Sequence, residues 1–395
     1  MSEGGARTWV MRLLALFVGV SMFVLAGEVA ARVLRLDEQD KQAMADAGGI
    51  LAFTGLHQIS DDPEQLYELK PGAKLELPAG SRVVTYAINS LGFRDVEFAE
   101  QKSPGVFRIL ALGDSMTFGP GVDLEQTYPK VLERLLNEGN EGRYQVINAG
   151  ASGYSAYEEV VTWRNRGEAL DPDLVIVGFC VNDVGDPRRQ MDARTLEVLG
   201  ELPDEMIPNP GDEPAVRPVG SPPDQTAVEA TKGSLPIPFK GVLRQHSALY
   251  RFLVRRYDAL LKKLRIRDPY SGALRRYYRD VDAILSDYST PEWQWLTKHW
   301  QSFQEISEET GVPWALVLFP WQYQLERDYD GVPQGMLSGR ASELGIFVVD
   351  PRPVFQQESF TDLYVDLAHF SAKGHQLVAE VLQEALHESG LLVGP

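Results

Sequence analysis

A chain of 395 residues is long enough for one large domain with insertions or for two domains. Hydrophobic residues make up 44% of it and charged residues 24%, so it can bury a substantial core. The formal net charge of −18 argues against a general nucleic-acid binder, which needs a basic surface to displace counterions from phosphates. With one cysteine, Cys180, no intramolecular disulfide can form, and its apolar sequence neighbours favour a buried thiol.

Residues 1–36 carry the clearest targeting signal. No charged residue occurs from Leu13 to Gly27, and Arg7 and Arg12 precede this run. A membrane-spanning helix needs roughly 20 residues, and residues 9–34 reach that length if the arginine side chain within them extends to the interface. We expect an uncleaved, single-pass anchor in the cell inner membrane, with the remainder of the chain exported. A cleaved signal peptide, which would leave a secreted protein, is the alternative.

Residues 37–104 form a polar, irregular segment before the main domain. Its stretches 67–77 and 81–95 alternate apolar and polar residues and contain the prolines, glycines and asparagines that are typical of turns. We therefore expect a small β-rich approach segment that packs against the main domain.

In the main domain, residues 105–395, apolar strands alternate with amphipathic helices. Short apolar runs predict strands at 107–113, 144–150, 173–179, 314–320 and 346–351. Apolar residues at helical spacing predict helices at 127–139, 155–170, 291–311 and 371–386. This alternation is typical of an α/β fold in which helices cover both faces of a parallel sheet.

The segment 187–290 interrupts this alternation. Ten of the 25 prolines lie between residues 187 and 240, which excludes a regular helix or a central strand there. The following stretch, 242–267, has one apolar stripe, and six basic residues lie between Leu249 and Ile266. It is either a membrane-surface helix or lid, or a helix that packs its stripe on the core and leaves its charges in solvent.

Four short polar motifs lie where predicted strands end. GDS with Ser115 follows the first strand, NAGASG with Gly153 follows the second, and VND with Asn182 follows the third. DLAH, with Asp366 and His369, lies after the fifth strand and before the last helix. Ligands of open α/β sheets bind outside the carboxyl ends of the strands, so we expect the four motifs to converge on one crevice.

The side chains in these motifs suit nucleophilic catalysis. A serine hydroxyl such as that of Ser115 becomes a good nucleophile when a neighbouring base takes its proton. His369 is the natural base, and Asp366 can accept a hydrogen bond from the other ring nitrogen. The backbone N–H groups of Ser115 and Gly153 and the amide of Asn182 are candidate donors to a tetrahedral oxyanion.

In this order, GDSMTFG, NAGASG, VND and DLAH resemble the four sequence blocks of the SGNH hydrolases, also called the GDSL family. The resemblance covers residues 107–388 and implies a three-layer α/β/α fold with a five-stranded, flavodoxin-like parallel sheet. It also implies that Ser115 is the nucleophile, that Asp366 and His369 complete a triad, and that Gly153 and Asn182 complete the oxyanion hole. The apolar N-terminus and the NSLGFRD segment resemble membrane-anchored bacterial members.

Taken singly, each motif has a structural alternative. GDS is also good N-cap chemistry, VND can form an Asx turn, and a lone DxxH often starts a helix. A metal site is a further alternative, built from Asp114, Asn182, Asp183 and His369. No clustered-histidine motif accompanies these residues, so we expect neither a metal nor another cofactor.

We therefore expect a serine esterase that hydrolyses a carboxylic ester, such as a glycan O-acetyl group or a lipid ester, through an acyl-enzyme. An O-acyltransferase that acts on envelope polysaccharide with the same triad is one alternative. An inactive module that binds glycan or an envelope partner is another. The sequence does not distinguish water from a sugar hydroxyl as the acyl acceptor.

Overall fold

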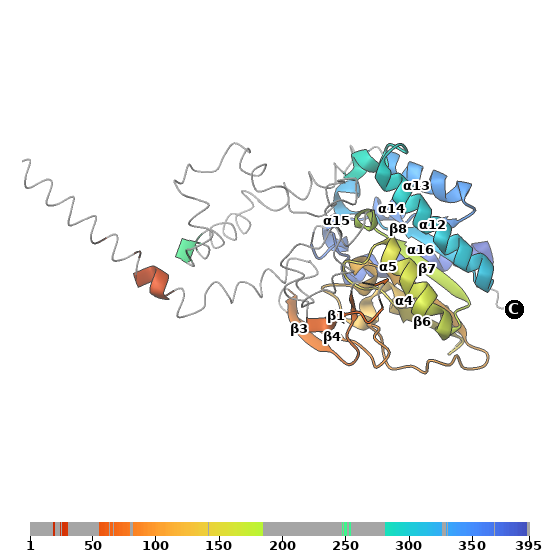
Figure 1. Cartoon of the computed structure of the whole chain (residues 1–395), viewed down its shortest axis with the longest axis horizontal. Helices are drawn as coiled ribbons and strands as arrows, with labels where there is room; N and C mark the ends of the chain where they lie inside the picture. Colours follow the sequence, from red (N-terminus) through yellow and green to blue (C-terminus); the bar gives the residue numbers. More distant parts are fainter. Residues whose placement is uncertain are drawn as a thin grey trace, which may run out of the picture. The chain divides into compact units, whose positions relative to one another are not determined.

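The computed structural model in Figure 1 describes two long parts of the chain and a few residues outside them. The described residues are 55–184 except 63, 66, 80, 81 and 141, 281–392 except 326–328, 330 and 367, and residues 19, 24, 26–30, 247, 249, 250 and 253. Contacts divide the chain into two units, one of residues 46–224 and 274–395, the other of residues 1–45 and 225–273. The sheet and all four polar motifs belong to the first unit.

A five-stranded parallel sheet forms the centre of the first unit. Its strands, in spatial order, are β6 (Tyr144–Asn148), β5 (Phe107–Gly113), β7 (Leu174–Phe179), β8 (Trp314–Leu318) and β9 (Phe347–Val349). Every neighbouring pair is parallel. The predicted α/β fold with a five-stranded parallel sheet is confirmed, because each of the five apolar runs expected to be strands in the main domain contributes one of these strands.

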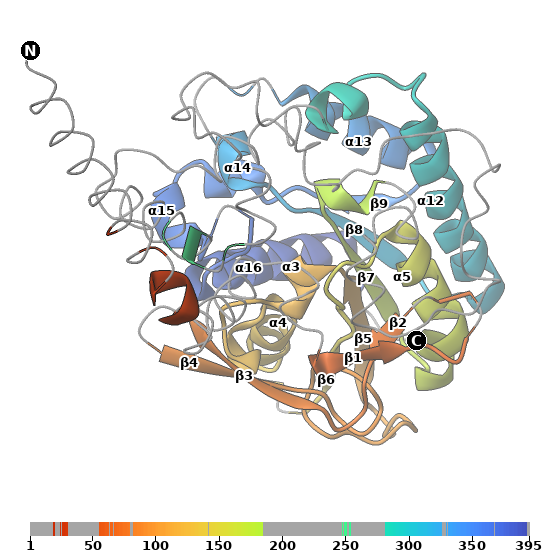
Figure 2. The same ribbon diagram turned by 60° about the vertical axis from the view of Figure 1, so that its left-hand side comes forward.

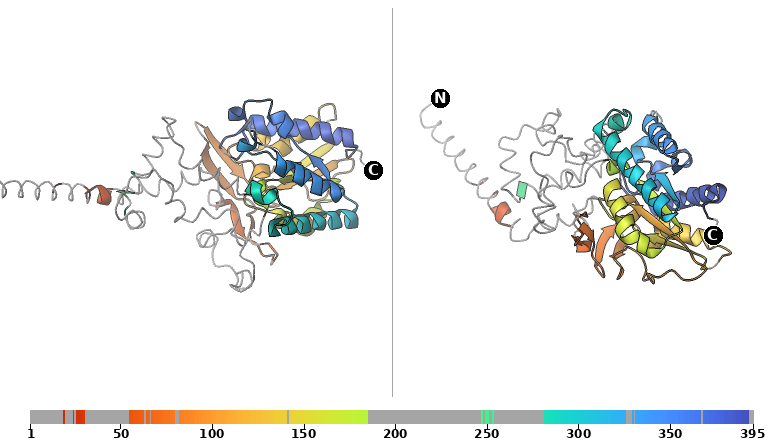
Figure 3. Two further views of the ribbon diagram at one scale, coloured as in Figure 1. Left: turned by 90° about the horizontal axis from the view of Figure 1, so that it is seen from above. Right: turned by 45° about the vertical axis from the view of Figure 1, so that its right-hand side comes forward.

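Helices cover both faces of the sheet (Figure 2). The helices α4 (Tyr128–Leu136) and α16 (Ala372–Ser389) pack together on one face, and α5 (Ala156–Thr162) and α12 (Pro291–Thr310) pack together on the other. The two views in Figure 3 show the same layering. The structure also describes the helices α3 (Ser115–Phe118), α13 (Val332–Glu343), α14 (Arg352–Phe355) and α15 (Phe360–Leu363).

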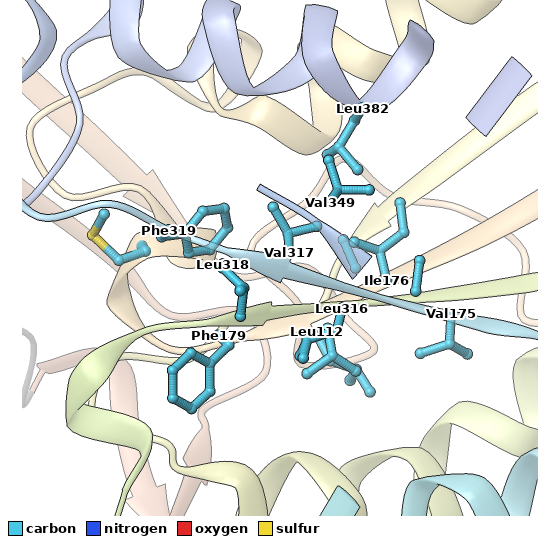
Figure 4. Close-up of a cluster of buried hydrophobic side chains, with 14 of the residues drawn as sticks. Leu112, Val175, Ile176, Phe179, Leu316, Val317, Leu318, Phe319, Val349 and Leu382 are labelled. Carbon is cyan, nitrogen blue, oxygen red and sulfur yellow. The ribbon is translucent and has the colours of Figure 1, made fainter. Parts of the chain in front are cut away.

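The core lies between the sheet and these helices. Every residue of β5, β7 and β8 is buried, so side chains on both faces of these strands are removed from water. Figure 4 shows Leu382 of α16 above Val349 and Val317 on one face and Phe179 pointing to the other. Burial on both faces explains why these strands have continuous apolar sequences rather than alternating ones.

The approach segment supplies two antiparallel pairs of strands. The strands β1 (His57–Ile59) and β2 (Tyr67–Leu69) form one pair, and β3 (Lys74–Ala79) and β4 (Arg82–Ala87) form the other. This part is not a detached linker, because Tyr67, Tyr86 and the downstream Arg94 are all buried in the first unit.

Two parts of the chain differ from the sequence expectation. The helix expected at 155–170 ends at Thr162 and continues as a single π turn and a 3-10 turn up to Leu170. Helix α13 was not predicted, because its sequence, VPQGMLSGRASE, contains a proline, two glycines and little apolar periodicity.

In the second unit, Glu28 accepts hydrogen bonds from the Ser247 hydroxyl at 2.7 Å and from the Leu249 backbone N–H at 3.0 Å. No helix within the described residues is long and apolar enough to cross a membrane. Most of the expected anchor, 1–36, and most of the insertion, 187–290, lie outside the described residues. Both expectations therefore stay predictions.

Candidate active site

Ser115 lies at the point where the buried strand β5 turns into the one-turn helix α3. Asp114 caps this helix, because its Oδ1 accepts a hydrogen bond from the Met116 backbone N–H at 2.8 Å. The capping role that GDS could have given to the serine therefore belongs to the aspartate. Ser115 is the first helical residue, and its hydroxyl is left for other contacts.

The structure brings Ser115, His369 and Asp366 into one hydrogen-bonded chain. The Ser115 hydroxyl donates to His369 Nε2 at 2.9 Å, and His369 Nδ1–H donates to Asp366 Oδ2 at 2.7 Å. The backbone N–H groups of Ala368 and His369 both donate to Asp366 Oδ1 at 2.8 Å. The carboxylate is thus oriented by its own loop, and it orients the imidazole in turn.

Charge and burial act in opposite directions on this pair. The partial burial of Asp366 would by itself raise its pKa, but the facing imidazole and the backbone donors lower that pKa to about 2. Burial alone would lower the pKa of His369, but the charge and hydrogen bond of Asp366, with a smaller contribution from Asp114, raise it above its ordinary value. Asp366 therefore stays ionised at neutral pH and favours the protonated form of His369.

The second motif, NAGASG, packs directly on α3, the helix that begins at Ser115. A Cβ atom at Gly150 would lie 2.4 Å from the Phe118 backbone nitrogen, so only glycine allows this approach. The Ala151 N–H donates to the Gly113 carbonyl at 3.0 Å. The loop with Gly153 is therefore fixed against the loop with Ser115.

Gly153 lies in a tight turn with φ of +83°, a conformation that favours glycine. Asn182 lies in a 3-10 turn, Val181–Asp183, directly after β7. The side chain of Asn182 falls outside the described part of the structure. The assignment of Ser115, Gly153 and Asn182 to an oxyanion hole therefore remains a proposal.

Asp114 and Asp183, the carboxylates of the alternative metal site, belong to a buried group that also contains Glu158 and Glu159, which the sequence analysis did not identify. Burial, then the charges of Asp114 and Glu158, raise the pKa of Glu159 well above its ordinary value. Burial, then the charge of Glu159, likewise raises the pKa of Asp183, although the Cys180 N–H donates to Asp183 Oδ2 at 2.5 Å. Within the described residues, no three His, Cys, Asp or Glu side chains are placed to hold a metal ion. Burial and the mutual repulsion of these carboxylates favour the protonated forms of Glu159 and Asp183.

We expect Glu159→Gln to stabilise the protein at neutral and alkaline pH. In the folded state the pKa of Glu159 is raised, so its stabilising contribution is present below the ordinary carboxyl pKa and is lost as pH rises. Glutamine keeps the shape of the side chain and does not ionise. The Tm at pH 8 should rise by about 2 °C, which corresponds to roughly 1 kcal/mol, and the Tm should depend less on pH.

The control for this change is Glu168→Gln, since Glu168 is exposed on the 3-10 turn that follows α5. Thermal melts of the three proteins between pH 5 and pH 8 are the measurement. A Glu159→Gln variant that is less stable than the wild type at pH 8 would show that the carboxylate is ionised in the fold.

Arg94, from the approach segment, binds the carbonyl groups at the C-terminal end of α3, the helix that begins at Ser115. It is fully buried and donates to the carbonyls of Phe118 at 2.5 Å, Gly119 at 2.6 Å and Val122 at 2.7 Å. Its guanidinium also lies over the rings of Tyr86 and Phe118, 4.5 and 4.9 Å from their centroids. Burial lowers the pKa of Arg94 to about 10, so it remains charged at neutral pH.

We expect Arg94→Lys to destabilise the fold despite keeping the charge. A compact ammonium cannot reproduce a planar fork that reaches three separate carbonyls. A loss of about 3 kcal/mol, the value of one or two charge-assisted hydrogen bonds, should lower the Tm by more than about 6 °C. Thermal melts of this variant and of Arg134→Lys, at an exposed position of α4, provide the comparison. Equal melting temperatures for the two variants would contradict the expectation.

His375, the second histidine near the site, has a structural role. Its Nδ1 accepts a hydrogen bond from the Tyr128 N–H at 3.1 Å, which satisfies a free donor at the start of α4. Burial, then the charges of Arg94 and His369, lower the pKa of His375 to about 3. It is therefore neutral at working pH and joins α4 to α16.

An α/β fold that joins a serine hydroxyl, an imidazole and a carboxylate in one chain of hydrogen bonds has the arrangement of serine hydrolases. The model of the GDSL-like lipase/acylhydrolase family matches residues 111–377. The chain belongs to this family and is an esterase-like hydrolase of the GDSL, or SGNH, type.

Similar solved structures are distant in sequence. One is LAE5, an α/β hydrolase from the metagenome of Lake Arreo, Spain, which is 15% identical over 73% of this chain and 97% of its own, with a TM-score of 0.38. Another is Axe2, an acetylxylan esterase from Geobacillus stearothermophilus, 14% identical over 71% of this chain and 94% of its own, with a TM-score of 0.36. No curated protein shows significant similarity to the chain.

Proposed function

We propose that the chain is a serine esterase that hydrolyses a carboxylic ester through an acyl-enzyme intermediate. The observation that carries the proposal is the pair of hydrogen bonds from Ser115 to His369 at 2.9 Å and from His369 to Asp366 at 2.7 Å. These lengths allow a proton to pass from the hydroxyl to the imidazole as the oxygen attacks.

In the proposed mechanism each group has one task. His369 Nε2 takes the Ser115 proton while Oγ bonds to the ester carbon, and the imidazolium then protonates the departing alcohol. Asp366 holds the imidazole in the tautomer with its proton on Nδ1 and stabilises the imidazolium. Water, deprotonated by His369, cleaves the acyl-enzyme and releases the acid. The backbone N–H groups of Ser115 and Gly153 and the amide of Asn182 would stabilise the oxyanion.

The test combines active-site labelling with turnover. A fluorophosphonate should label Ser115, as mass spectrometry of the digested protein would show, and the labelled enzyme should no longer hydrolyse an aryl acetate. Labelling elsewhere, or aryl acetate hydrolysis that survives complete labelling, would contradict the proposal.

The acyl acceptor is decided by a second arm of the same assay. We propose water, so acetate release should be unchanged when a polysaccharide is added. Acetyl groups that appear on the added glycan, with a matching fall in free acetate, would instead identify an O-acyltransferase with the same nucleophile.

We also propose that residues 1–36 anchor the protein in the inner membrane and that the catalytic unit is exported. The support is the uncharged run from Leu13 to Gly27 behind two arginines. In cells, the intact chain should stay in the membrane fraction after alkaline extraction. A protease added to spheroplasts should degrade the catalytic unit, and protection of that unit would contradict the proposed orientation.

A further inference from the structure

The turn that carries Gly153 contains one peptide group whose orientation the turn itself does not set. The Tyr154 N–H donates to the Ala151 carbonyl at 3.1 Å and closes the turn. In this four-residue turn, residues 151–154, Gly153 is the third residue and has a positive φ. Ser152 is the second residue and has no positive φ, and this combination defines a type II turn. The central peptide group, between Ser152 and Gly153, can face either way in such a turn, because glycine also tolerates the type I alternative.

A phenol from the approach segment fixes this peptide group. The Tyr67 hydroxyl, at the start of β2, donates to the Ser152 carbonyl at 3.0 Å. That carbonyl and the Gly153 N–H belong to the same planar, trans peptide group and point in opposite directions. A hydrogen bond that holds the carbonyl on one side therefore also holds the N–H on the other.

Tyr67 is itself held firmly by its neighbours. It is fully buried, and its own carbonyl accepts a hydrogen bond from the Tyr154 hydroxyl at 3.0 Å. Gln65 Nε2 donates to that same hydroxyl at 2.5 Å. Burial, then the charge of Glu158, raise the pKa of Tyr67 well above its ordinary value, so the phenol stays a donor at every working pH. The strand and the turn thus bind each other at two points.

We propose that Tyr67 is a positioning residue of the oxyanion hole and acts through the Ser152–Gly153 peptide group. The inference rests on the proposed function, in which the Gly153 N–H donates to the oxyanion. A hydrogen bond to the carbonyl also polarises the amide and strengthens its N–H as a donor. Being fully buried, Tyr67 does not touch the substrate.

The test is Tyr67→Phe, which removes one oxygen atom and keeps the ring. We expect kcat for an aryl acetate to fall about tenfold, less than the 10²–10³-fold cost of deleting an oxyanion donor outright, because the peptide group stays but loses its fixed direction. KM should not change, because the substrate carbonyl carries little charge before the attack. The rate of fluorophosphonate labelling at Ser115 should fall in parallel, and the acid limb of the pH profile should stay in place.

The matched control is Tyr154→Phe, another buried phenol of the same contact that donates to the Tyr67 carbonyl instead of to the turn peptide. Both variants should lose stability, but kcat should fall clearly further in Tyr67→Phe, which alone loses the hydrogen bond to the turn peptide. The variant Gly153→Ala, alone and combined with Tyr67→Phe, completes a double-mutant cycle. Because both changes act on one peptide group, their effects on kcat should be less than additive.

The outcomes separate this inference from the proposed function. Turnover that depends on Ser115 but is unaffected by Tyr67→Phe would overturn the inference and leave the esterase proposal intact. So would equal losses of kcat in the two tyrosine variants, or full additivity in the cycle. Turnover that does not depend on Ser115 would instead overturn the proposed function.

Discussion

Ser115→Ala should lower kcat for an aryl acetate by about 10⁵–10⁶-fold, the scale found when the nucleophile of a serine hydrolase is removed. Without the hydroxyl, His369 has no proton to take and no acyl-enzyme forms. The fold should remain, because the Asp114 cap and the backbone bonds of α3 do not use the serine side chain. Steady-state rates and a burst of released phenol at high enzyme concentration are the measurements.

A matched control for this change is Ser302→Ala, because the Ser302 hydroxyl only donates to a backbone carbonyl of its own helix, α12. This variant should keep both the rate and the Tm. Ester turnover that is the same in Ser115→Ala as in the wild type would remove the basis of the proposed mechanism. A large fall in the Tm of Ser115→Ala would show that the serine has a structural role.

Asp366→Asn should have the second largest effect, a fall in kcat of about 10²–10³-fold. Removal of the corresponding aspartate in a buried triad costs about 10⁴-fold, and we expect less here because the Asp366 side chain is 37% exposed and water can partly replace it. The amide keeps the shape but removes the charge that holds the imidazole in the productive tautomer.

The same variant should move the acid limb of kcat/KM to lower pH. His369 acts as a base only when neutral, and the negative charge of Asp366 raises the pKa of His369 above its ordinary value. Activity of the wild type should therefore rise with pH through a midpoint above about 6.5, the ordinary histidine pKa. Asparagine removes the charge, so the midpoint of the acid limb should move to lower pH while the maximal kcat/KM decreases.

The measurement is kcat/KM from pH 5 to pH 9 for the wild type, Asp366→Asn and the control Asp362→Asn. Asp362 is an exposed carboxylate in the same stretch of chain, so its loss should leave both the limb and the plateau in place. An acid limb that moves to higher pH in Asp366→Asn would contradict the direction of the Asp366–His369 interaction.

The central sheet could be predicted from the sequence because burial on both faces leaves a direct signal. Phe107–Gly113 is apolar almost throughout because none of its side chains reaches water. Helix α13 gave no such signal, because only a few of its residues are buried and its glycines interrupt the helical spacing of its apolar residues. Glu159 could have been found, since it lies on the same helical stripe as Ala156, Val160 and Trp163, where a carboxylate is out of place.

The residues of the candidate site fall into two groups by the kind of signal they leave. Ser115, Asp366 and His369 occur in short motifs with fixed spacing, and the structure brings these three side chains together. Tyr67 and Arg94 act on backbone carbonyls across long sequence separations, and a carbonyl acceptor leaves no trace in the sequence. Their partners could be found only in three dimensions.

The position of Arg94 and Tyr67 in the chain determines how much of the protein is needed for a working enzyme. Both precede residue 111, where the family match begins, yet one holds the end of the nucleophile helix and the other holds the Gly153 turn. A recombinant piece cut at the edge of the family match would keep all three triad side chains and lose the contacts that place them. Expression designs and chimeras should therefore start ahead of residue 55, and variation upstream of GDS should be read as variation of the active site.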